Sequence, residues 1–365
     1  MNNKIIIVLF LVGTVLFQNC GSNPKIQGHK LEIFAPSKIY ESLILKRLSN
    51  KGELIPVDTL KINEGKAEYI HQYTMPDIFF ISNGTSNLMV FLEPEDIKMY
   101  INAHHFIADS IRGGQENRRF GEYLSHVDSL KQLQKKTLME IKNQSPSAKK
   151  DIQNKLFALA DTIRQYGFDF ARHPSLAGIA VLTEMTFQNN ANVKKLFEIY
   201  NNYPETLKRT NAGKFLTKRL NDISVGAIGM RARNFTAPNP DGKLISLYSA
   251  MGKVTLVDFW AAWCKPCRIE NPNLVRIYDK YHEQGLNIIS VSLDSDKDAW
   301  LKAIRDDKLN WYHVSHLKGW KEPVAVMYKI RAIPQNILID KKGIIRYKNL
   351  RGKLLEQKIQ ELLDE

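Results

Sequence analysis

VDFWAAWCKPCRIENP, residues 257–272, contains two of the three cysteines in a chain of 365 residues. Only Lys265 and Pro266 separate Cys264 from Cys267. A disulfide between them would close almost no loop, whereas a structural disulfide stabilises most when it closes a long one. A zinc site needs more ligands at matching spacing, and the sequence has no second Cys-x-x-Cys. The spacing therefore favours a redox-active dithiol over a structural bridge or a metal site.

The residues on either side of the two cysteines predict a strand followed by a helix. Residues 254–260 are apolar and rich in β-branched side chains, which is typical of a buried central strand. Beyond Cys267, apolar residues recur at helical spacing as far as Gly285. Cys264 then lies at the helix N-terminus, where free backbone N–H groups and the helix dipole favour a thiolate. Cys264 is therefore the predicted nucleophile and Cys267 the predicted resolving thiol.

With these flanks the segment resembles thioredoxin, and residues 228–365 are similar to the TlpA/ResA-type thiol–disulfide oxidoreductases. The resemblance rests on WCKPC after VDFW, on the turn at 239–242, on GLNIISVSLD at 285–294 and on YKIRAIPQNILIDKKGIIRYKNLRG at 328–352. It implies an α/β thioredoxin fold for residues 228–365 and an enzyme that exchanges disulfides. It implies no cofactor and no metal.

The resemblance gives roles to two carboxylates that flank the dithiol. Asp258, six residues before Cys264, matches the buried aspartate of thioredoxin, and a charge in an apolar strand is costly unless it serves a function. Glu270, three residues after Cys267, matches the glutamate that TlpA/ResA-type proteins place beside the active site. We expect either carboxylate to accept the proton of Cys267 as that thiol becomes a nucleophile. The alternative for Glu270 is a solvated position on the helix surface.

Three more residues are expected, by the same resemblance, to bind substrate. Ile333 and Pro334 match the family's cis-proline pair, where the backbone before the proline pairs with an extended substrate peptide. A loop proline in the trans form is the alternative. Trp263 immediately precedes Cys264 and is assigned to the same substrate surface.

The first twenty residues predict export. Lys4 is followed by an almost wholly apolar stretch at 5–17. That length is typical of a secretory signal and is too short for a permanent helix across a bilayer of about 30 Å. An uncleaved membrane anchor is the alternative. Cys20 lies where bacterial lipoproteins are cut and acylated, so residues 1–20 are interpreted as a lipoprotein signal peptide and Cys20 as its lipidation site.

The composition limits the classes of partner. The net charge is +14, and half of it falls after residue 227, without a dense basic block that is interleaved with aromatic residues. This pattern argues against a nucleic-acid partner. A basic surface still favours docking to anionic lipid or to acidic proteins. The hydrophobic content of 44% is ordinary for a globular protein and excludes a wholly disordered chain.

Two further regions are predicted upstream of the dithiol domain. Residues 25–112 show short alternating segments separated by turns, which indicates a small β-sandwich-like domain. Residues 115–225 predict a helical segment, because apolar residues recur there at spacings of three and four: Leu156, Leu159, Ile163, Tyr166 and Phe170. This layout, with VDTLKINEGKAEY at 57–69, resembles the N-terminal part of many Bacteroidetes-type lipoprotein thioredoxins. A spacer, a dimerisation surface and a client-binding module all remain open for it.

These features together predict a thiol–disulfide oxidoreductase of the cell envelope that faces the periplasm and is held on a membrane by the lipid anchor at Cys20. The resemblance implies disulfide-containing envelope proteins as substrates and an electron-donating membrane protein as the partner that reduces the enzyme again. Reduction or isomerisation of disulfides is the favoured direction. The Lys265-Pro266 pair does not by itself exclude an oxidase.

Two other classes of protein are considered. A thioredoxin-fold peroxidase would need a Pro-x-x-x-Thr-x-x-Cys context around a solitary cysteine, which residues 258–263 do not provide. A non-enzymatic lipoprotein would bind a partner through its N-terminal domains and keep the C-terminal domain as a scaffold. The presence of Cys264, Cys267 and Pro334 together argues against that interpretation.

Overall fold

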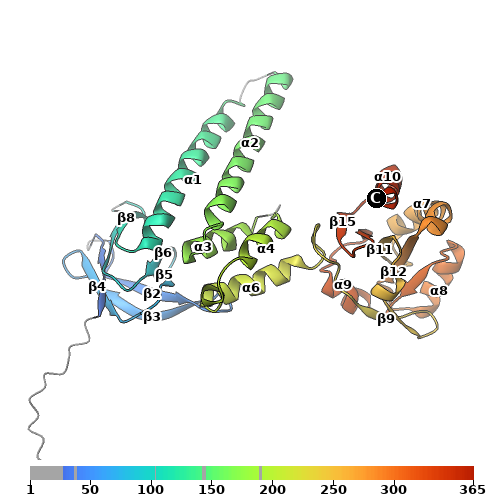
Figure 1. Cartoon of the computed structure of the whole chain (residues 1–365), viewed down its shortest axis with the longest axis horizontal. Coiled ribbons are helices and arrows are strands. Elements are labelled where there is room, and N and C mark those ends of the chain that lie inside the picture. Colours follow the sequence, from blue (N-terminus) through green and yellow to red (C-terminus); the bar gives the residue numbers. More distant parts are fainter. Residues whose placement is uncertain (1–27, 37–38, 103, 142–144, 189–190) are drawn as a thin grey trace, which may run out of the picture.

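The computed structural model describes residues 28–36, 39–102, 104–141, 145–188 and 191–365 (Figure 1). The predicted signal segment and Cys20 lie outside these residues. Along the chain a β-rich part, a helical part and an α/β part follow one another, coloured blue, green and orange to red in Figure 1. Among the described residues, no helix has both the length and the apolar character that crossing a bilayer requires.

Residues 29–112 form two four-stranded sheets, as expected for a β-sandwich-like region. One sheet has the strand order β4-β1-β7-β8 and the other has the order β3-β2-β5-β6. Alternate side chains of both sheets, such as Ile33 and Phe79, are buried in one shared core, as strands with one apolar face require. The strands are β1 (His29–Phe34), β2 (Ser42–Leu48), β3 (Leu54–Lys61), β4 (Lys66–His71), β5 (Asp77–Ser82), β6 (Asn87–Leu92), β7 (Ile97–Ile101) and β8 (Ala108–Arg112).

The helical segment follows, also as expected. Glu93, in the turn before β7, accepts hydrogen bonds from the backbone N–H groups of Gln115 and Glu116 at 2.9 and 3.0 Å, and so joins the first helix to the sandwich. The helices α1 and α2 lie side by side and project from the rest of the segment (Figure 1). The helices are α1 (Gln115–Met139), α2 (Pro146–Ala171), α3 (Leu176–Met185), α4 (Val193–Asn201), α5 (Glu205–Lys208) and α6 (Asn211–Ser224).

The last part of the chain is built on a five-stranded sheet with the order β13-β12-β11-β14-β15. The strands β11, β12 and β13 run parallel, and β14 and β15 run antiparallel to their neighbours. The strands are β11 (Val254–Trp260), β12 (Leu286–Ser292), β13 (Tyr312–Val314), β14 (Gln335–Asp340) and β15 (Ile345–Lys348). All seven residues of the central strand β11 are buried, as its apolar sequence predicts.

Helices cover both faces of this sheet. The helices α7 and α10 pack on one face, and α8 and α9 pack on the other. This is the thioredoxin fold that the sequence predicts for residues 228–365. The helices and the small elements before the sheet are α7 (Lys265–Tyr281), α8 (Lys297–Asp306), α9 (Pro323–Met327), α10 (Gly352–Asp364), β9 (Thr236–Pro238), β10 (Leu244–Ser246), η1 (Tyr248–Ala250), η2 (His282–Gln284) and η3 (Gly319–Lys321).

The segment between α6 and β9 is bonded to the sheet. The N–H of Gly229 donates to the carbonyl of Ile345, and the N–H of Ala232 donates to the carbonyl of Gly343, both at 2.8 Å. The Lys329 ammonium also donates to the carbonyl of Asp222, near the end of α6, at 2.5 Å. The backbone that connects the two regions therefore runs along β15 and is fixed there.

Candidate active site

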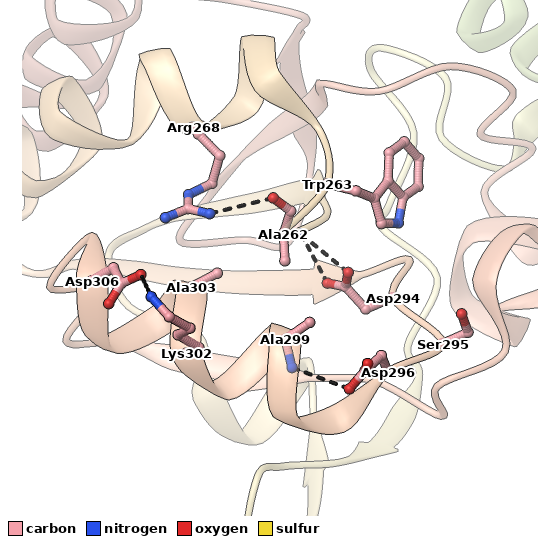
Figure 2. A pocket seen from close by; sticks show the side chains of 10 residues that line it. All are labelled: Ala262, Trp263, Arg268, Asp294, Ser295, Asp296, Ala299, Lys302, Ala303 and Asp306. Carbon is pink, nitrogen blue, oxygen red and sulfur yellow. Dashed lines mark hydrogen bonds and ion pairs between the residues drawn. The ribbon is translucent and has the colours of Figure 1, made fainter.

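The loop that leads from β11 to the first cysteine is held by two charged side chains. The Asp294 carboxylate accepts the N–H of Ala262 with both oxygens, at 3.0 and 3.1 Å, and the Arg268 guanidinium donates to the carbonyl of Ala262 at 3.3 Å (Figure 2). Asp294 is buried, and this burial raises its pKa. The sequence shows a carboxylate-rich loop after β12 but does not reveal that Asp294 supports the dithiol loop.

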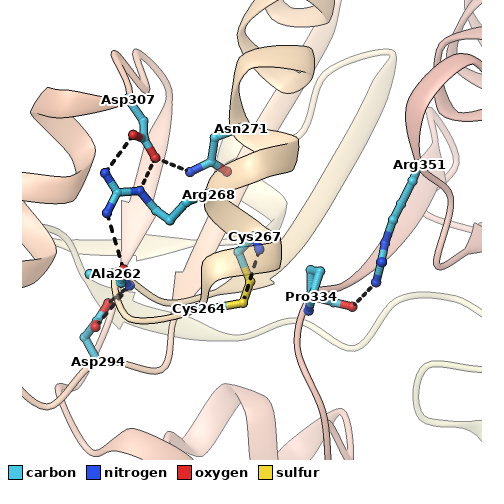
Figure 3. The surroundings of a disulfide bond; sticks show 9 residues. All are labelled: Ala262, Cys264, Cys267, Arg268, Asn271, Asp294, Asp307, Pro334 and Arg351. Carbon is cyan, nitrogen blue, oxygen red and sulfur yellow. Dashed lines mark hydrogen bonds and ion pairs between the residues drawn. A yellow bond between two sulfur atoms is a disulfide. The ribbon is translucent and has the colours of Figure 1, made fainter.

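Cys264 and Cys267 form a disulfide at the N-terminus of α7, with 5.3 Å between their Cα atoms (Figure 3). Cys264 is the N-cap of the helix, and its sulfur accepts the backbone N–H of Cys267 at 3.3 Å. The two side chains are 4% and 2% exposed. Cys264 therefore occupies the position at which helix N–H groups would stabilise a thiolate after reduction.

Asp258 lies in the middle of β11, with Ser290 of β12 and Asn336 of β14 as its partners in the neighbouring strands. Burial and then the charge of Glu270 raise the pKa of Asp258 to about 7, while the Ser290 hydroxyl and the charge of Arg351 act in the opposite direction. A carboxyl with this pKa is partly ionised near neutral pH. It can therefore take up or release a proton under those conditions.

A narrow cavity is lined by both Asp258 and Cys267. Its free volume is about 10 Å³, which is about the space that one water molecule needs. The residues that line it come from β11, from α7, from the loop that holds Pro334 before β14 (the proline loop), from β14 and from the residue before α10. They are Asp258, Cys267, Glu270, Asn271, Leu274, Pro334, Asn336 and Arg351. The structure therefore brings both predicted carboxylates together beside Cys267.

Glu270 is fixed by neighbours on both sides. One oxygen of its carboxylate accepts the backbone N–H of Gly352 at 2.9 Å and the side-chain amide of Asn273 at 2.8 Å. The side chain is half-buried and lies in the wall of the cavity. It thus tethers the first residue of α10 to α7 and does not extend freely from the helix surface.

The predicted substrate residues lie in two places around the disulfide. The Ile333–Pro334 peptide bond is cis, and Pro334 lines the narrow cavity beside Cys267. Trp263 is 56% exposed and borders a separate cavity of about 320 Å³ between the dithiol loop and α8 (Figure 2). The structure therefore groups Pro334 with the carboxylates and places Trp263 apart from them.

Two residues near the site are absent from the predicted set. Trp320, in η3, is 50% exposed, and its ring centroid lies 6.1 Å from that of Trp263. Arg351 precedes α10 and donates to the carbonyl of Pro334 at 2.8 Å (Figure 3). Neither residue belongs to a periodic pattern, and an aromatic or basic residue in a loop carries little signal without the fold.

The arrangement supplies the groups that thiol–disulfide exchange needs: two adjacent sulfurs, a helix N-terminus and carboxylates beside the second sulfur. No group of three or more histidine, cysteine, aspartate or glutamate side chains in the described ranges could hold a metal ion. The carboxylates beside Cys267 are suited to proton transfer to and from sulfur.

Comparisons with known proteins point to the same part of the chain. Residues 228–348 match the AhpC/TSA family. The thiol-disulfide oxidoreductase ResA of a Bacillus cereus strain is 34% identical over 130 residues, which are 36% of this chain and 73% of that protein. The protein of the same name from Bacillus thuringiensis subsp. konkukian is 32% identical over 136 residues, 37% and 76% of the two chains.

Solved structures are similar to the same region. The thioredoxin domain of a thiol-disulfide oxidoreductase from Bacteroides vulgatus is 36% identical in sequence. The match covers 38% of this chain and 98% of that one, with a TM-score of 0.36.

Proposed function

The chain belongs to the family of ResA-type thiol–disulfide oxidoreductases, and from that premise we propose that it reduces or isomerises protein disulfides in the cell envelope through Cys264 and Cys267. The observation that carries the proposal is the position of the Cys264–Cys267 disulfide, at a helix N-terminus and beside the Asp258 cavity. The disulfide corresponds to the oxidised enzyme, which is the form that remains after a substrate has been reduced.

In the first step the reduced enzyme presents the Cys264 thiolate. Its sulfur attacks one sulfur of the substrate disulfide, so that a mixed disulfide forms and the other substrate sulfur leaves as a thiolate. The N–H of Cys267, which contacts the Cys264 sulfur, would stabilise the negative charge before attack. The backbone of Ile333, before Pro334, would pair with the substrate in the manner of an added strand, and the exposed Trp263 would contact the substrate beside Cys264.

In the second step Cys267 resolves the mixed disulfide. Its thiol proton passes to Asp258 or Glu270, directly or through one water, and its sulfur attacks that of Cys264. The bond from Cys264 to the substrate breaks, and the reduced substrate leaves as a thiolate. The enzyme then carries the Cys264–Cys267 disulfide and needs two electrons from an external dithiol before the next cycle.

The sequence and the chemistry of this cycle support the proposed location and partners. The apolar segment at 5–17 and Cys20 support export and a lipid anchor on a membrane that faces the periplasm. The substrates would be envelope proteins with disulfides, and the electron donor would be a membrane protein with an accessible dithiol. A peroxidase is disfavoured because Ala261 stands three residues before Cys264, where the peroxidase motif requires a hydroxyl.

The proposal is tested by insulin reduction and by redox equilibrium with glutathione, with the full chain. The wild-type protein should accelerate dithiol-driven insulin reduction, and Cys264→Ser should reduce the rate to background. A reduction potential near about −270 mV supports a reductase, and one near about −120 mV identifies an oxidant instead. Absence of any Cys264-dependent reduction would overturn the proposed exchange.

A further inference from the structure

The start of α10 is bonded to three other parts of the active site. The backbone of Leu350 exchanges two hydrogen bonds with the Asn336 side chain on β14, at 2.8 and 3.0 Å. The next residue, Arg351, donates to the carbonyl of Pro334 at 2.8 Å, and the N–H of Gly352 donates to the Glu270 carboxylate at 2.9 Å. Residues 350–352 therefore connect the sheet, the proline loop and the dithiol helix.

Arg351 is also the only cation among the residues that line the Asp258 cavity. Figure 3 shows its side chain extended toward Pro334, on the side of that residue away from Cys264. The cavity has space for about one water molecule and Asp258 is buried, so solvent screens the Asp258 carboxylate poorly, whereas the side chain of Arg351 is exposed and its charge is partly screened. Two carboxylates and one guanidinium thus share a site in which the charges of Glu270 and Arg351 act on Asp258.

We propose that Arg351 is a positioning residue for the second step of exchange: its guanidinium fixes the Pro334 carbonyl and supplies a positive charge that favours the ionised form of Asp258 beside Cys267. The inference rests on the proposed function, because it concerns the transfer of the Cys267 proton to one of the two carboxylates. The proton leaves Cys267, its sulfur bonds to Cys264, and the substrate sulfur leaves with the electron pair of the broken bond. Arg351 touches none of the reacting sulfurs and acts through Asp258.

The groups that face Asp258 determine the direction of the effect. Glu270 and Cys267 face it from α7, Ser290 from β12 and Asn336 from β14, and Arg351 lies at the start of α10. Glu270 adds negative charge and raises the pKa of Asp258, whereas Arg351 lowers it. Loss of the Arg351 charge should therefore move proton uptake by the cavity to higher pH.

The experiment follows the second step separately from the first, in the full-length reduced protein with a fluorogenic peptide disulfide. The first phase reports attack by Cys264, and the second reports release of the peptide thiol by Cys267. We measure the rate constant of the second phase against pH and take as the midpoint the pH at which this rate constant is half its maximum. The proteins compared are the wild type, Arg351→Gln, Arg351→Lys and the control Lys353→Gln. Lys353 lies in the first turn of α10, is exposed and does not line the cavity.

Arg351→Gln should raise this midpoint by about half a pH unit or more. Arg351→Lys should keep the midpoint close to that of the wild type, because it keeps the charge. Lys353→Gln should leave the midpoint unchanged. In an Asp258→Asn, Glu270→Gln background, Arg351→Gln should produce no shift. Arg351→Met, similar in length but uncharged, replaces Arg351→Gln if that variant does not fold.

Identical midpoints in the wild type and the uncharged variants would overturn the inference. A fall in the rate that is equal at every pH would not rescue it, since a purely structural role would lower the rate in that way. An equal shift in Arg351→Lys and Arg351→Gln would also overturn it. These outcomes leave the proposed exchange intact as long as both phases are present. A wild-type protein without the first phase would instead contradict the proposed function.

Discussion

Arg268 and Asp307 form a two-bond ion pair between the first turn of α7 and the residue that follows α8. The guanidinium Nε and Nη2 each donate to one oxygen of the carboxylate, the latter bond at 2.7 Å, and Asn271 donates to the same carboxylate at 2.7 Å. Because Arg268 also donates to the carbonyl of Ala262, the ion pair ties the dithiol loop to α8. The rigidity of the dithiol therefore depends on a residue far from it in the sequence.

The first prediction concerns this ion pair. Asp307→Asn should lower the free energy of unfolding by about 1–2 kcal/mol, because the pair is largely shielded from water and the new amide cannot accept from Arg268 with both of its atoms. Urea unfolding of the oxidised protein measures the change. Asp306→Asn is the control: Asp306 forms an ion pair with Lys302 on the exposed surface of the helix, so we expect a loss below about 0.5 kcal/mol. Equal losses in both variants would contradict the role given to Asp307.

The second prediction separates the roles of the two cysteines. Cys267→Ser keeps the nucleophile but removes the resolving thiol, so mixed disulfides with substrate proteins should accumulate on Cys264. Non-reducing electrophoresis with mass spectrometry detects these adducts, and the double variant with Cys264→Ser should form none. Full catalytic turnover by Cys267→Ser would remove its proposed role as the resolving residue.

Local sequence patterns were sufficient to predict the strand, the dithiol and the helix that begins at Cys264, because these features are contiguous in the chain. They do not predict the environment of the dithiol. The N–H of Gly352 reaches Glu270 across 82 residues, and only the packing of α10 against α7 and β11 brings the two together. Pro272 is a local signal that misleads. Proline normally ends a helix, yet α7 continues through Pro272 because the apolar face of the helix is buried against the sheet.

The N-terminal half shows the same limit. Alternating strands and helical spacing were enough to predict a β-rich region followed by helices, because each pattern is local. The order of strands in the two sheets was not predictable, since β1 pairs with both β4 and β7. Glu93 is a further example: it lies in an ordinary acidic turn, and only the fold places its carboxylate at the N-terminus of α1.

The third prediction concerns the charge of Glu270. Glu270→Gln keeps an acceptor for the N–H of Gly352 but removes the negative charge that raises the pKa of Asp258. The pKa of Asp258 should therefore fall, and the midpoint of the Cys267 step should move to lower pH by about 0.5–1 unit. This shift is opposite in sign to the one expected for Arg351→Gln. The same two-phase kinetic assay measures it, with the exposed Glu283→Gln as control, and a shift to higher pH would contradict the proposed electrostatics.

The fourth prediction concerns stability against pH and follows from the raised pKa of Asp258. The folded protein holds this proton up to about pH 7, whereas an aspartate in the unfolded chain releases it near 3.8. Between these values the folded state binds more protons, so its stability falls as the pH rises through this window. The contribution is at most about 4 kcal/mol, because one pKa unit corresponds to about 1.4 kcal/mol.

Asp258→Asn should remove this loss, so the oxidised variant should be more stable than the wild type at pH 8 by at least about 1 kcal/mol, while its Cys267 step slows. Urea unfolding at pH 5 and pH 8 gives the difference for each protein. Asp279→Asn changes an exposed aspartate on α7 and should keep the wild-type dependence on pH. If the free energy of unfolding of Asp258→Asn changed between pH 5 and pH 8 as much as that of the wild type, the Asp258 carboxyl would not have a raised pKa in the folded protein. Asp258 could not then act as a proton acceptor near neutral pH.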